Sequence, residues 1–215
     1  MSSRICLGLL VLALLAGGSA LAQNKVRTET IRPPAAGKPG APPESKFKSS
    51  GHVVPPGSIA GAQEIITDVS RLPPAVARTR ERILAAARSG ELQKLLTVMQ
   101  MNETMPIFSF SEDKDPVAFW KANYPDSEGV EVLSILITVL ETGFVHVDVG
   151  TTQEIYLWPY FARLSLKSLT PEQKVELFRI VTGADYKDMI EFGAYSFYRL
   201  GIAPDGTWHF FVAGD

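Results

Sequence analysis

The sequence FVHVDVGTTQEIYLW, residues 144–158, contains two short runs in which apolar and polar side chains alternate around a central glycine. Successive side chains of a β-strand point to opposite faces, so this period of two predicts a β-hairpin. Val147 should pair with Ile155, because a slip of one residue would set apolar side chains against polar ones. That register leaves residues 150–152 as the loop and buries the valines with Leu157. The opposite face carries Phe144, His146, Asp148, Glu154, Tyr156 and Trp158.

Two carboxylates are expected to face each other in this hairpin. The register places Asp148 opposite Glu154 on the adjacent strand. Like charges in such a position are unfavourable unless a cation or a shared proton relieves them, which makes the pair a candidate functional feature. The alternative is an ordinary sheet surface with both carboxylates in water, since antiparallel sheets commonly expose one face to solvent.

A second hairpin is predicted for residues 195–213. The Pro-Asp-Gly sequence at 204–206 is typical of a tight turn and would pair Ala203 with Thr207. In that register the core face carries Ser196, Tyr198, Leu200, Ile202, Trp208, Phe210 and Val212. The opposite, mixed face carries Tyr195, Phe197, Arg199, Thr207, His209 and Phe211.

If the two hairpins join one sheet, their mixed faces would form a single candidate surface. Its members are His146, Asp148, Glu154, Tyr156, Trp158, Arg199 and His209. Aromatic rings with a few polar groups suit stacking on sugars or apolar ligands, and an exposed strand edge suits a peptide. The competing expectation is that helices cover this face and that its aromatic side chains belong to the core.

Three catalytic chemistries bear on the residues of this surface. Both histidines with a carboxylate could bind zinc, but no H-x-x-x-H or H-E-x-x-H spacing supports a metal site, and no metal or other cofactor is expected. Asp148 and Glu154 could act as the acid and base of a glycoside hydrolase. A serine nucleophile is not indicated, since no G-x-S-x-G elbow is present, and no phosphate-binding glycine loop indicates nucleotide use.

Helical periodicity dominates the sequence between the N-terminal arm and the first hairpin. Helices are predicted at about 73–89, 91–101 and 127–141, the last of them apolar around nearly its whole circumference. Thr170 and Gln173 form a capping box for a further helix, which Gly183 should end before another begins at about 185. The prediction is an α+β fold with N-terminal helices packed on a small antiparallel sheet made of two hairpins.

The N-terminus indicates export. Arg4, an apolar run at 6–15 and the small residues Ser19 to Ala22 predict a signal peptide over residues 1–22. Residues 23–58 are rich in proline and basic residues and predict a disordered linker, which is either a spacer or a contact for anionic envelope polymers. Residues 59–215 should form a single α+β domain, without a transmembrane segment after signal cleavage.

The composition favours a periplasmic or secreted protein. Cys6 is the only cysteine and lies in the signal peptide, so the exported chain would have no disulfide. The formal net charge of −2 does not indicate a nucleic-acid partner. The sequence therefore predicts a non-enzymatic periplasmic binding or envelope-associated module, with a protein or an envelope polymer as partner. The alternative is a hydrolase of a cell-wall polymer or glycan that uses Asp148, Glu154 and a histidine.

Overall fold

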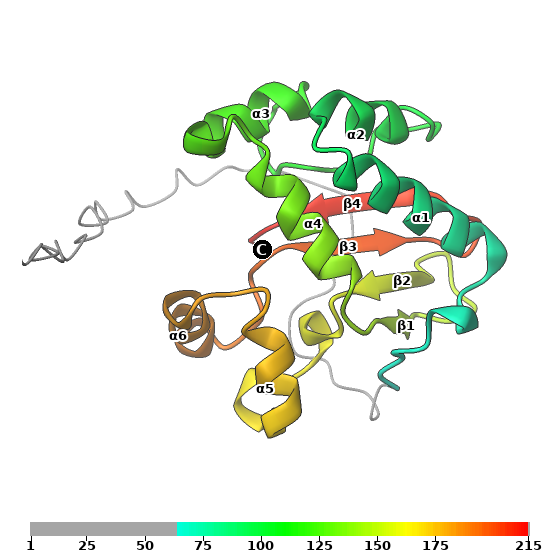
Figure 1. Ribbon diagram of the computed structural model, residues 1–215. Helices are drawn as coiled ribbons and strands as arrows, with labels where there is room; N and C mark the ends of the chain where they lie inside the picture. Colours follow the sequence, from blue (N-terminus) through cyan, green and yellow to red (C-terminus); the bar gives the residue numbers. More distant parts are fainter. Residues whose placement is uncertain (1–63, 215) are drawn as a thin grey trace, which may run out of the picture. The chain divides into compact units, whose positions relative to one another are not determined.

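The computed structural model describes residues 64–214 (Figure 1). The predicted signal peptide, the predicted linker and residues 59–63 of the predicted domain lie outside this part of the chain. The helices are α1 (Pro74–Arg88), α2 (Leu92–Met99), α3 (Pro116–Asn123), α4 (Glu131–Leu140), α5 (Pro171–Leu177) and α6 (Gly183–Phe192). Short 3-10 helices are η1 (Val69–Arg71), η2 (Pro125–Ser127), η3 (Tyr160–Arg163) and η4 (Leu166–Ser168). The strands are β1 (Val145–Val147), β2 (Ile155–Trp158), β3 (Arg199–Ile202) and β4 (Trp208–Val212).

The two predicted hairpins lie side by side in one antiparallel sheet with the strand order β1-β2-β3-β4. The fold is therefore α+β, as the sequence predicts. The first hairpin has the expected register, with Val145 opposite Leu157 and Val147 opposite Ile155. The join between the hairpins pairs Leu157 of β2 with Gly201 of β3. Outside the named strands, Ile66 extends the β1 edge by pairing with Phe144.

The second hairpin departs from the predicted register by one residue. Ile202 lies opposite Trp208 as expected, but Leu200 lies opposite Phe211 and not Phe210. The shift occurs between Gly201 and Ile202, and it leaves His209 without an opposite residue on β3, which is the signature of a β-bulge. The bulge turns Phe211 into the core and moves Phe210 to the opposite face, so the predicted assignment of these two rings was wrong.

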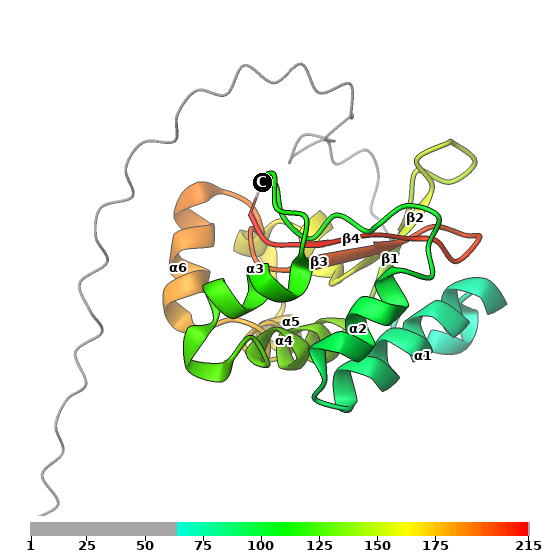
Figure 2. The same cartoon turned by 90° about the horizontal axis from the view of Figure 1, so that it is seen from above.

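Both faces of the sheet are covered, which corrects the expectation of a solvent-exposed mixed face. Figure 2 shows α1, α2 and α4 on one side of the sheet. The core on this side includes Phe144, Tyr156, Trp158, Leu200, Ile202, Trp208 and Phe211. The second core joins the other face to the chain between β2 and β3 and includes Val145, Val147, Leu157, Phe161, Leu177, Met189 and Tyr195. Aromatic side chains that were predicted on the outer face therefore belong to the core, because helices cover that face.

Side-chain caps set where several helices begin. Asp115 accepts hydrogen bonds from the backbone N–H groups of Val117 and Ala118 at the start of α3. The predicted capping box of Thr170 and Gln173 begins α5. Gly183, however, does not end this helix. It is the first residue of α6, and the preceding Thr182 forms a second capping box.

No helix among residues 64–214 is long and apolar enough to cross a bilayer.

Candidate functional site

The structure brings three of the predicted surface residues together at the loop end of the first hairpin. The imidazole of His146 stacks on the ring of Tyr156, with centroids 4.1 Å apart and planes 10° from parallel. His146 donates from Nε2 to Oε1 of Glu154 over 2.8 Å, and the second carboxylate oxygen accepts from the N–H of Gly150 over 2.8 Å. These donors, the Gly150 N–H first, lower the pKa of Glu154 from its ordinary value. The arrangement ties the loop to the strands.

Asp148 does not join this cluster. Its backbone has a φ of 54°, in the left-handed region, so the chain leaves the strand direction one residue after β1 ends. The carboxylate instead lies 3.9 Å from the guanidinium of Arg163. Asp148 and Glu154 therefore turn to different partners, and the expected opposition of two like charges is not formed.

The other predicted members of the surface lie apart. Trp158 is fully buried, and its indole Nε1 has no hydrogen-bond partner among the described residues. Arg199 begins β3 and is paired in the sheet with Val212, away from the hairpin loop. His209 is exposed on β4, the edge strand opposite β1. Three interstrand spacings, roughly 14 Å, separate these edges, too far for His209 and His146 to share a metal ion.

The described residues contain no group of three or more histidine, cysteine, aspartate or glutamate side chains placed to hold a metal ion. The acid and base groups of the first hairpin form paired contacts, Glu154 with His146 and Gly150, and Asp148 beside Arg163.

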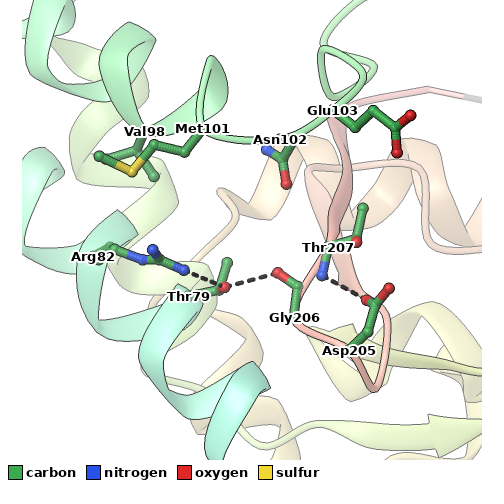
Figure 3. Close-up of a pocket in the computed structure, with 9 residues that line it drawn as sticks. All are labelled: Thr79, Arg82, Val98, Met101, Asn102, Glu103, Asp205, Gly206 and Thr207. Carbon is green, nitrogen blue, oxygen red and sulfur yellow. Dashed lines mark hydrogen bonds between the residues drawn. The ribbon is translucent and has the colours of Figure 1, made fainter.

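Two recesses lie elsewhere, on the α1–α2 pair. The first recess has a volume of about 220 Å³ and lies between these helices and the turn that joins β3 to β4 (Figure 3). It is lined by Thr79, Arg82, Val98, Met101, Asn102, Glu103, Asp205, Gly206 and Thr207. Sequence analysis predicted both helices and the turn, but it contained no signal that residues more than a hundred positions apart would meet.

Hydrogen bonds fix the polar wall of this recess. Arg82 donates to the hydroxyl of Thr79, which in turn donates to the carbonyl of Gly206 over 2.7 Å (Figure 3). On the turn itself, Asp205 accepts from the N–H of Thr207, and this bond lowers the pKa of the Asp205 carboxyl. The wall is thereby preformed, with a guanidinium on one side and a carboxylate on the other.

A second, more apolar recess of about 340 Å³ adjoins the first. The two share Arg82, Val98 and Met101, and we call the two adjoining recesses together the α1–α2 groove. The second recess is lined by Arg82, Ala85, Ala86, Ser89, Lys94, Thr97, Val98 and Met101. Met101 is 60% exposed, and Ala85 is exposed beside it, so this recess offers apolar surface to a ligand.

Comparison with protein-family models, with curated proteins and with solved structures finds no match for this chain.

Proposed function

We propose that the protein is an exported, non-enzymatic binding module of the cell envelope and that its ligand lies in the α1–α2 groove. The observation that carries the proposal is the groove itself, in which a recess with apolar lining residues adjoins one lined by Arg82 and Asp205. Binding sites of this kind combine apolar contact area with a few polar groups that orient the ligand. The signal-peptide pattern of residues 1–22 supports a periplasmic or secreted location.

The chemistry of the groove favours an extended ligand with apolar and charged groups in succession. Ala85, Val98 and Met101 offer apolar contact, whereas Arg82 and Asp205 offer opposite charges near one end. A segment of an envelope protein or a peptide-bearing wall polymer has this character. No observation favours the alternative hydrolase, because Glu154 is held by His146 and Gly150, and Asp148 lies beside Arg163.

The proposal is tested by co-sedimentation of the purified protein with an isolated envelope fraction. The groove variant Ala85→Asp/Met101→Asp should bind at least about tenfold less, since it puts two charges among the apolar lining residues. Val175→Asp is the matched control, because Val175 is 70% exposed on α5 and lies outside the groove.

The hairpin variant Asp148→Asn/Glu154→Gln distinguishes the binding module from the alternative hydrolase in the same assay. A binding module should keep its envelope binding when these carboxylates are neutralised, and no soluble sugar should be released by either protein. Release of sugar by the wild type that stops in this double variant would reject the proposal of a non-enzymatic module. Equal loss of binding in the groove variant and in Val175→Asp would reject the groove as the binding site.

A further inference from the structure

A second exposed apolar feature lies in the segment that joins α2 to α3. Met105, Ile107 and Phe110 are 37%, 54% and 57% exposed, and we call them the apolar strip. An isolated bridge pairs Ile107 with Phe210, so this segment runs along the outer edge of β4. Single exposed apolar residues are normal on a protein surface, but several of them on one short segment indicate an interaction site.

The strip is held in a fixed position by β4. Ile107 donates its N–H to the carbonyl of His209 over 2.9 Å and accepts from the N–H of Phe211 over 2.8 Å. This pairing makes Ile107 a neighbour of the half-buried Phe210, on the face of the sheet opposite α1, α2 and α4. The next residue, Phe108, points the other way and is buried. The side chain of Ile107 therefore points to solvent from a backbone that hydrogen bonds to β4 hold in place.

Phe108 provides the anchor on the helix side. Its ring packs edge-on against Phe119 and Trp120 of α3, with centroids 5.6 and 6.1 Å apart. One residue of the segment therefore belongs to the core, while its neighbour stays in solvent. The alternation of side chains along an extended chain explains both positions.

Carboxylates lie at both ends of the strip. Glu103 precedes it, and Glu112 and Asp113 follow it, all of them exposed. Asp113 accepts hydrogen bonds from the hydroxyls of Ser109 and Ser111, so it is held close to the strip. None of these three carboxylates forms an ion pair with another residue of the described part of the chain.

The backbone at the strip is poorly suited to accept a further β-strand. Both backbone groups of Ile107 are used by β4, so those of the flanking Pro106 and Phe108 point to the outer side. Pro106 has no N–H to donate, and proline at a sheet edge discourages strand addition. Recognition at this place must therefore depend on side chains.

We propose that the apolar strip and the carboxylates around it form a docking surface for an extended segment of another protein, in which apolar side chains are flanked by basic ones. Apolar side chains of the partner cover Ile107 and Phe110, and its lysine or arginine side chains meet Glu112 and Asp113. Charge complementarity selects a basic partner over an acidic one, because an acidic segment would bring like charges together. Glu103 also lines the α1–α2 groove, but the strip, Glu112 and Asp113 do not, so variants of those residues test this surface alone.

The test measures binding of short fluorescent peptides to the purified full chain by anisotropy. A peptide of leucines flanked by lysines should bind at least about tenfold more tightly than one of leucines flanked by glutamates or one of serines flanked by lysines. Its affinity should fall as salt is raised, because exposed charges are screened. No preference among the three peptides would reject the proposal.

Two independent variants locate the binding. Ile107→Ser/Phe110→Ser should weaken the lysine–leucine peptide by about tenfold through lost apolar contact, and Glu112→Gln/Asp113→Asn should weaken it while abolishing most of the salt dependence. The matched controls are Val175→Ser/Phe192→Ser, which removes exposed apolar side chains of α5 and α6, and Asp188→Asn/Glu191→Gln. Equal weakening in a variant and its control would overturn the assignment.

The same variants distinguish other occupants. A dimer that dissociates in Ile107→Ser/Phe110→Ser, measured by sedimentation equilibrium, would make a second copy the occupant and would overturn the proposal of a separate partner. If neutralising the basic residues of 23–58 in the full chain raises the affinity for the peptide, that segment is the occupant. This result would also overturn the proposal of a separate partner. Failure here leaves envelope binding through the groove intact, because Ala85→Asp/Met101→Asp tests that function at different residues.

Discussion

Glu154 closes the loop of the first hairpin by binding His146 with one oxygen and Gly150 with the other. Sequence alternation predicted that Glu154 would share a face with His146 and Tyr156, and the structure places these three together. It could not predict the departure of Asp148, because that depends on a left-handed backbone at a residue that is not glycine. A single such residue converted an expected pair of like charges into two separate, satisfied carboxylates.

The lowered pKa of Glu154 makes a prediction about stability and pH. A carboxyl whose pKa is lower in the folded than in the unfolded state stabilises the fold above the unfolded value of about 4.3. This stabilisation is lost as the pH falls through the folded pKa. The urea midpoint of wild type should therefore exceed that of Glu154→Gln at pH 5.5, and the two midpoints should converge at pH 3. Comparison with the variant is needed because Asp205 and Asp68 also have a lowered pKa. If the two urea midpoints differ by the same amount at pH 5.5 and at pH 3, the lowered pKa of Glu154 does not stabilise the fold as described.

At the scale of elements, the register of the first hairpin and the capping box of Thr170 and Gln173 were predictable, whereas the bulge in the second hairpin was not. Alternation in residues 195–213 fits a regular ladder equally well, and it assigned Phe210 to the core. The observed bulge follows from packing over Gly201, whose missing side chain leaves room for Ile155 and the ring of Phe210 on either side. Such a contact between neighbouring strands is not encoded in the periodicity of either strand.

The turn between β3 and β4 packs closely on α1 and sets one wall of the groove. Gly206 has a φ of 94°, and a Cβ at this position would lie 2.9 Å from the carbonyl oxygen of Ala75. Gly206→Ala should therefore lower the free energy of unfolding by about 1–3 kcal/mol, combining backbone strain with a steric clash against backbone. Urea denaturation measures it.

Gly150→Ala is the control for this substitution. Gly150 also has a positive φ, of 77°, but an added Cβ would meet nothing within 4 Å. Gly150→Ala should lower the free energy of unfolding by less than Gly206→Ala does. The difference between the two losses measures the contact between the turn and α1. Equal losses in the two variants would show that the turn does not pack on the helix as described.

For the whole molecule, sequence predicted the class of fold and the two hairpins but not how the layers would cover the sheet. The first hairpin has aromatic residues on one face and valines on the other, a pattern that fits either one exposed face or two buried ones. Two cores resolve this ambiguity, with Trp158 in the first and Val147 in the second. Covering both faces removed most of the predicted surface. The α1–α2 groove lies elsewhere, where Thr79 of α1 donates a hydrogen bond to Gly206 in the turn between β3 and β4.

The central claim is that ligands of the exported protein lie along α1 and α2 and not at the His146–Glu154 hairpin. The most direct test is photo-crosslinking in cells with benzoylphenylalanine in place of Met101, Val149 or Val175, which are 60%, 63% and 70% exposed. The account predicts a defined adduct from position 101, on the groove, and none from position 149, on the hairpin loop, or from position 175 on α5. A defined adduct from position 149 with none from position 101 would contradict it.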